Sequence, residues 1–98
     1  MLDKIKKIFE LQGKISQIKK ELEDTKIETS RDNGNIKVIM SANQKLLSLD
    51  IADSLIVAQD KEGLKRDLLN CINEAIEKTQ QIATQKAKEI TGLNIPGL

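Results

Sequence analysis

Aromatic side chains are almost absent from this chain of 98 residues, which has one phenylalanine, Phe9, and neither tryptophan nor tyrosine. Aromatic residues usually bury the largest apolar area, so the core has to be built from leucine, isoleucine, valine and alanine. Hydrophobic residues make up 39% of the sequence and charged residues 32%, which is lean core material for one domain spanning residues 1–98. We therefore expect self-association to contribute to stability.

Histidine is also absent, which removes the commonest general base and metal ligand. Cys71, the only cysteine, has no histidine partner for nucleophilic catalysis and is interpreted as a small packing residue. Asp50 and Asp53 have no third ligand nearby and are interpreted as solvated turn residues. The sequence thus predicts that the chain is not an enzyme, with no catalytic residue, metal site, cofactor or small-molecule substrate.

Three further absences bear on the compartment. A single cysteine excludes a disulfide within the chain, which favours a reducing environment. No apolar run approaches the roughly 18 residues of a membrane span. The first residues lack the continuous apolar stretch of a signal peptide. Together these features predict a cytoplasmic protein with no membrane partner.

The apolar spacing predicts a first helix over about residues 2–22. Its apolar residues alternate spacings of four and three, which is the pattern of a heptad seam. The seam consists of Ile8, Leu11, Ile15, Ile18 and Leu22, and Ile5 and Phe9 widen it near the start.

The period then changes, and residues 26–51 predict three short strands in an antiparallel meander. Asn33-Gly34 favours a tight hairpin, because both residues tolerate the positive φ of the two central turn positions. The middle strand alternates Ile36, Val38 and Met40 with Lys37 and Ile39, and the third is expected to place Leu47, Leu49 and Ile51 on one side. One face of this sheet should be apolar and needs a cover.

A connector over residues 52–59 leads to a long helix over about residues 61–90. Asp60 is a plausible N-cap, Gly92 a plausible C-terminal glycine, and Pro96 prevents continuation. At 1.5 Å per residue this helix spans about 45 Å, longer than strands of five or six residues. The surplus has to protrude or pack on another chain.

The apolar face of this long helix is therefore the predicted packing and dimer seam. Its main members are Leu68, Ile72, Ile76 and Ile82, and the stripe also contains Leu69, Ala75, Thr79, Ala83 and Ile90.

Net charge is only +1, from 16 basic and 15 acidic residues, and gives no global signal for nucleic acid. The charge is uneven, however, because residues 1–20 hold six lysines against Asp3 and Glu10. These lysines are the candidate DNA-binding residues: Lys4, Lys6, Lys7, Lys14, Lys19 and Lys20. Such a run is more often only the solvated face of a helix. Without aromatic stacking or a groove-reading motif, DNA contact would be directed at phosphates.

Four short motifs occur along the chain in a fixed order. They are the heptad helix ending in Glu21-Leu22-Glu23, the strand Ile36-Lys37-Val38 after a glycine turn, the run Asp60-Lys61-Glu62 followed by Ile72-Asn73-Glu74-Ala75, and the tail from Thr91 to Leu98. From about Ile8 to Leu98 the chain resembles the YbaB/EbfC family of bacterial nucleoid-associated DNA-binding proteins. It departs from the family pattern at Ala52-Asp53, Asp67 and Asn70-Cys71.

The resemblance implies an α+β fold and a homodimer in which the sheets of two chains join and the helices project. It also implies binding of duplex DNA with low sequence specificity in the nucleoid. The alternative is a cytoplasmic adaptor whose long helices bind another protein and whose DNA affinity is negligible. Local charge in three dimensions distinguishes these two interpretations. DNA binding is favoured if Lys4, Lys7 and Lys14 of two subunits line one concave surface, and the adaptor is favoured if they scatter with acidic residues interleaved.

Overall fold

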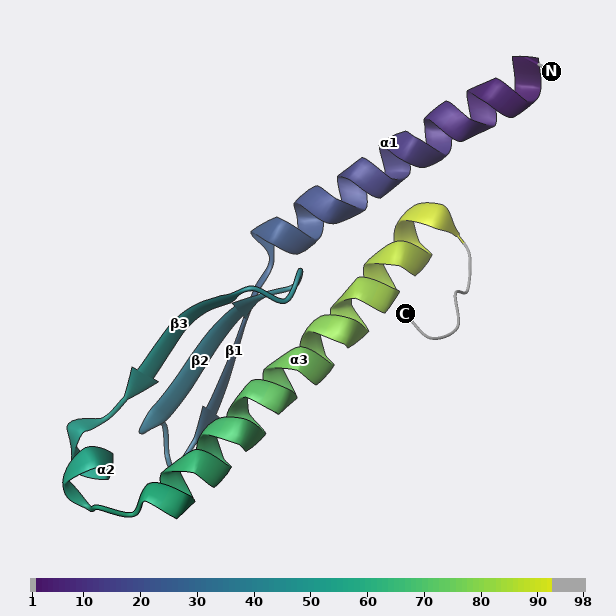
Figure 1. Cartoon of the computed structure of the whole chain (residues 1–98). Coiled ribbons are helices and arrows are strands. Elements are labelled where there is room, and N and C mark those ends of the chain that lie inside the picture. Colours follow the sequence, from purple (N-terminus) through teal and green to yellow (C-terminus); the bar gives the residue numbers. More distant parts are fainter. Residues whose placement is uncertain (1, 93–98) are drawn as a thin grey trace.

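The computed structural model describes residues 2–92 as two long helices and a small sheet, with the element order predicted from the sequence (Figure 1). The elements are α1 (Leu2–Asp24), β1 (Lys26–Arg31), β2 (Ile36–Ser41), β3 (Leu46–Ile51), α2 (Asp53–Val57) and α3 (Lys61–Thr91). The three strands form one antiparallel sheet in the order β1-β2-β3. The molecule is elongated, 67 Å by 22 Å by 17 Å, because α3 lies along the sheet while α1 projects beyond it.

The first hairpin turns at the predicted Asn-Gly pair. Asn33 and Gly34 have φ values of 56° and 85°, and the Asn35 N–H donates to the Asp32 carbonyl at 3.0 Å. Positive φ at both central positions matches the right-handed twist of the flanking strands. The pair of β1 and β2 residues nearest the turn is Arg31 and Ile36, so residues 32–35 form a loop of four residues.

The second hairpin corrects one sequence expectation. Ile39 pairs with Ser48 but Met40 pairs with Leu46, so the third strand contains a β-bulge and Leu47 is its extra residue. A bulge shifts the alternation of side chains by one position. Leu46, which pairs with Met40, therefore joins Leu49 and Ile51 on the apolar face, where simple alternation along the strand would have placed it on the opposite face.

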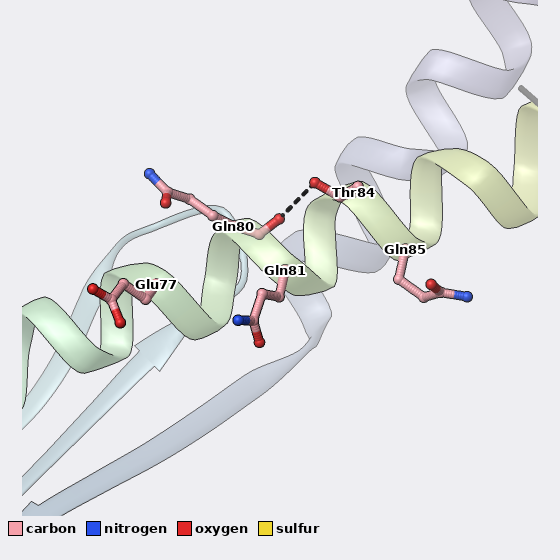
Figure 2. Close-up of a pocket in the computed structure, with 5 residues that line it drawn as sticks. All are labelled: Glu77, Gln80, Gln81, Thr84 and Gln85. Carbon is pink, nitrogen blue, oxygen red and sulfur yellow. Dashed lines mark hydrogen bonds between the residues drawn. The ribbon is translucent and has the colours of Figure 1, made fainter. Parts of the chain in front are cut away.

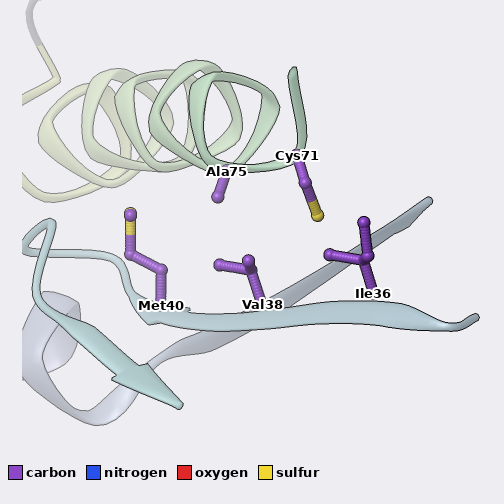
Figure 3. Packing of buried hydrophobic residues seen from close by; sticks show 5 residues of the cluster. All are labelled: Ile36, Val38, Met40, Cys71 and Ala75. Atoms are coloured by element: carbon purple, nitrogen blue, oxygen red, sulfur yellow. The ribbon is translucent and has the colours of Figure 1, made fainter. Parts of the chain in front are cut away.

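The core lies between β2 and the middle of α3 (Figure 3). Ile36, Val38 and Met40 point from the sheet toward Cys71 and Ala75, and all five are buried. Small residues on the helix let its backbone approach the sheet closely, so the branched side chains of β2 fill the space between them. The interpretation of Cys71 as a packing residue is confirmed.

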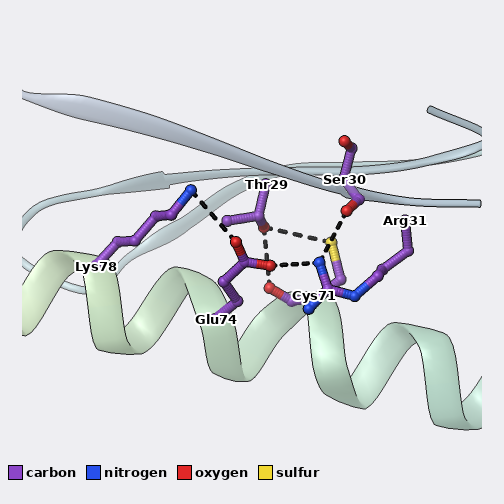
Figure 4. Close-up of polar contacts among 6 residues, drawn as sticks. All are labelled: Thr29, Ser30, Arg31, Cys71, Glu74 and Lys78. Carbon is purple, nitrogen blue, oxygen red and sulfur yellow. Dashed lines mark hydrogen bonds and ion pairs between the residues drawn. The ribbon is translucent and has the colours of Figure 1, made fainter. Parts of the chain in front are cut away.

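Polar contacts fix the register of α3 on β1 (Figure 4). The buried Thr29 hydroxyl donates to the Cys71 carbonyl at 2.9 Å and lies 3.3 Å from the Cys71 sulfur. Arg31 forms an ion pair with Glu74, which also contacts the Lys78 amine at 3.3 Å. The helix carbonyl thus gives the buried Thr29 hydroxyl a partner, and the ion pair lies at the half-exposed edge of the contact.

Both predicted ends of the long helix are confirmed. The Asp60 carboxylate caps α3 by accepting the Gly63 N–H at 3.0 Å. At the other end Gly92 has a φ of 69° and donates to the Lys88 carbonyl at 2.9 Å. Pro96, expected to prevent continuation, lies outside the described residues. The predicted connector over residues 52–59 contains the short helix α2.

Hydrogen bonding by Arg31, with a smaller contribution from Lys78, lowers the pKa of Glu74 below its usual value of 4.5. A carboxylate with a lowered folded-state pKa stabilises the fold above its unfolded pKa, and this contribution is lost as the pH falls through the folded value.

We expect Glu74→Gln to be less stable than wild type at pH 7, with the difference closing below about pH 4. Urea unfolding at pH 7, 5 and 3 measures it, with Glu77→Gln as the matched control on the same helix. A difference that stays constant with pH would contradict this prediction.

Candidate nucleic-acid interface

The six candidate lysines all lie on α1, a helix with no buried residue. Lys4, Lys6, Lys7, Lys14, Lys19 and Lys20 are exposed, and within residues 2–92 none of them takes part in an ion pair. A lysine with no internal partner can neutralise a phosphate without first breaking a contact.

The helical period divides these lysines between two main sides of α1. At 100° per residue, Lys4, Lys7 and Lys14 share one side. Lys6 and Lys20 lie roughly opposite, and Lys19 lies between the two groups. The structure therefore does not gather all six lysines on one face, and Asp3 and Glu10 fall beside the first group.

Contacts at its C-terminal end set the direction in which α1 projects. Glu21 lies 3.8 Å from the Lys86 amine of α3, and the Thr25 hydroxyl donates to the Glu21 carbonyl at 2.6 Å. Ile18 and Leu22 are half-buried there, whereas the residues toward the start of the helix are exposed. The basic half of α1 is thus an arm held only at its base.

A polar hollow of about 450 Å³ lies on the exposed side of α3 (Figure 2). It is lined by Glu77, Gln80, Gln81, Thr84 and Gln85. Three of these residues are glutamines, whose amides both donate and accept hydrogen bonds. The sequence analysis did not single out this surface, although the run of polar residues at helical spacing marks it. It offers hydrogen bonds to a polar partner, and its one formal charge, on Glu77, is negative.

Apolar surface stays uncovered along β3. Because α3 packs against β1 and β2, Leu46 and Leu49 remain 49% and 46% exposed on the same face of the sheet as the core. Across from them, α3 presents Leu69, Ile72 and Ile76 on the flank opposite Glu74. We call these five residues the apolar stripe.

The predicted seam of α3 meets this stripe only in part. Leu68, Ile72 and Ile76 are half-buried and pack against the core, and Ile82 is also half-buried. Leu69 is 61% exposed, so this member of the predicted seam is left available to another chain. The contact is centred instead on Cys71, Ala75 and Thr79, and this rotates Leu69 away from the sheet.

Residues 2–92 offer neither a metal-binding cluster nor a membrane-spanning helix. No cluster of three or more histidine, cysteine, aspartate or glutamate side chains is arranged to hold a metal ion. Neither does any helix in this range combine the length and apolar character needed to cross a membrane.

Comparison with known proteins agrees with the fold. The model of the YbaB/EbfC DNA-binding family matches residues 1–94. A nucleoid-associated protein of Desulforamulus reducens is 30% identical over 95 residues, covering 96% of this chain and 90% of the relative. Another from Prochlorococcus marinus is 32% identical over 101 residues, covering 100% and 86%. The crystal structure of an uncharacterized protein from Helicobacter pylori superposes with a TM-score of 0.72 at 26% identity, covering 93% of this chain and 89% of that one.

Proposed function

Because the chain belongs to the YbaB/EbfC DNA-binding family, we propose that it is a nucleoid-associated protein that binds duplex DNA as a homodimer, mainly through backbone phosphates and with low sequence specificity. The observation that carries the proposal is the set of six exposed, unpaired lysines on the projecting helix α1. The family is described by DNA binding, not by a catalysed reaction.

The side chains that α1 presents favour contacts with DNA phosphates over contacts with bases. Phe9 is the only aromatic residue of the chain, so no platform is available for stacking against bases. Lysine is a flexible point charge that suits phosphate oxygens. Phosphate contacts position a protein on DNA but carry no sequence information. Low specificity is therefore the expected consequence.

The homodimer is supported by the apolar stripe and by its position at a sheet edge. β3 is an edge strand, so one row of its backbone N–H and C=O groups has no partner within the sheet. Pairing β3 with β3 of a second copy would satisfy that row and bury Leu49 and Leu69 together. The joined sheet would carry two α1 arms, which doubles the local positive charge available to one DNA duplex.

We expect binding of random duplex DNA that weakens steeply with salt. If about four to eight phosphates are neutralised per dimer, log affinity should fall against log salt with a slope of roughly −4 to −7. This corresponds to a loss of roughly a hundredfold to ten-thousandfold between 50 and 200 mM salt. Gel-shift titrations at both salt concentrations measure the slope. Random and natural duplexes should compete within about tenfold of each other.

Two matched triple variants distinguish the effect of the lysines on α1 from the effect of positive charge elsewhere in the chain. Replacing Lys4, Lys7 and Lys14 with glutamate should weaken binding to all sequences and flatten the salt slope. Replacing Lys37, Lys45 and Lys61 with glutamate makes the same change of charge away from α1, where all three are also exposed, and should have a smaller effect. Equal effects would remove the assignment to α1. If wild type fails to shift DNA even at 50 mM salt, the adaptor becomes the better interpretation.

For the dimer, we expect sedimentation equilibrium at micromolar concentration to give at least twice the 10.9 kDa chain mass. Leu69→Asp should lower that mass while preserving helicity, because Leu69 is exposed within one chain and a charge is costly only in the dimer contact. Val57→Asp is the control, since Val57 is 78% exposed and lies on α2, away from the stripe. A Leu69→Asp protein of unchanged mass would place the interface elsewhere.

A further inference from the structure

The heptad seam of α1 is a second uncovered apolar surface, separate from the apolar stripe. Ile8, Leu11 and Ile15 are 56%, 50% and 43% exposed, whereas Ile18 and Leu22, close to α3, are half-buried. Three exposed aliphatic side chains in a row over two turns of helix are unusual for a surface with no partner. The sheet dimer proposed above does not need this surface.

The positions along the seam indicate another helix as the partner. With Ile8 and Ile15 at heptad position a, the d positions hold Lys4, Leu11 and Ile18. Isoleucine and leucine at alternating a and d positions pack as knobs into the holes of a facing helix that has the same repeat. A second copy of α1 supplies that repeat.

A parallel pairing of two α1 helices is disfavoured by charge. In register, the two Lys4 side chains would face each other across a d layer. On the flanks of the seam, Lys14 occupies position g and Lys19 occupies position e. In a parallel pair, position g faces the position e that lies five residues later in the partner. Lys14 would therefore lie opposite the partner's Lys19, twice per pair. No opposite charges come together in this arrangement. Every charged contact made by the paired seam would be repulsive.

An antiparallel pairing removes most of these repulsions. Leu11 then packs opposite the partner's Ile15, with Ile8 and Ile18 forming the next layer. The two Lys4 residues move to opposite ends of the contact. On one flank Lys7 lies opposite the partner's Glu21, twice per pair, and one like-charge contact between the two Lys14 residues remains at the centre.

From this complementarity we propose that α1 pairs antiparallel with α1 of a second copy, centred between Leu11 and Ile15. The pairing goes beyond DNA binding and does not depend on it. Combined with the sheet contact, it would give each chain two different self-complementary surfaces. Two such contacts link dimers end to end, so a protein bound to one DNA segment could hold a protein bound to another.

Site-directed cross-linking tests the orientation on the full chain. Cys71 is buried, so wild type should not react with a short bis-maleimide and serves as the blank. In the antiparallel pair residue 12 lies about 3 Å along the axis from its counterpart, whereas residue 4 lies about 27 Å away. Gln12→Cys should therefore give a covalent pair of chains, and Lys4→Cys should not.

A second variant keeps this test separate from the proposed sheet dimer. Combining Gln12→Cys with Leu69→Asp disrupts the sheet contact, and the covalent pair should persist. If it disappears, α1 helices meet only within the sheet dimer and the proposal is overturned. Cross-linking of Lys4→Cys would show a parallel pair, in which the two residues 4 face each other across a d layer, and would also overturn the proposal. No cross-link at either site means that the seam is covered by something other than α1.

A matched pair of neutral substitutions tests the charges. Lys7→Gln removes two attractive contacts and should weaken the pairing about two- to threefold. Lys14→Gln makes the same chemical change but removes a like-charge contact, so it should strengthen the pairing by a similar factor. Sedimentation of the Leu69→Asp background, in the absence of DNA, measures both. Effects of the same sign would contradict the antiparallel register.

Discussion

The close contact between α3 and β2 is the interaction on which the rest of the structure depends. Cys71, Ala75 and Thr79 occur at successive turns of α3 and are fully buried, and the small side chains let the helix approach Ile36 and Val38. A larger residue at Ala75 would lift the helix from the sheet and separate Thr29 from the Cys71 carbonyl. With so few fully buried residues, one well-packed contact has to hold the sheet, the helix and their relative direction.

That contact also determines what remains exposed. A single helix covers two strands, because a helix with its side chains is about 10 Å wide and neighbouring strands lie about 5 Å apart. The third strand therefore keeps its apolar side chains in solvent. A larger core with aromatic residues could have covered β3 within the chain. This sequence has one phenylalanine, and Phe9 lies on the exposed arm, so no aromatic side chain is available to cover β3.

The elements were predictable because their signals are local. Asn33-Gly34, Asp60 and Gly92 fix turns and caps through their own backbone preferences, which a neighbour does not alter. The exposure of Leu69 and the β-bulge at Leu47 are different, because they depend on how one element packs on another. Periodicity alone defines an apolar face of α3 without specifying the angle at which a narrow sheet meets it. The positions of the six lysines around α1 also followed from the helical period, but the direction of the arm depends on the contact between Glu21 and Lys86.

The two roles proposed for α1 overlap on one side of the helix, where Lys4 lies within the heptad seam, and separate on the other. The heptad seam is flanked by Lys7 and Lys14, whose charges determine the orientation of a paired helix. Lys6 and Lys20 lie roughly opposite the seam, where a paired helix leaves them accessible to phosphate. Pairing of two arms would thus bring Lys6 and Lys20 from two chains onto one elongated helical unit without covering them, whereas Lys4 would lie within the contact. The chain as a whole is nearly neutral, but its α1 helix carries an excess of lysines. Assembly brings several α1 helices together, so their positive charges add up on one surface although the net charge of each chain is small.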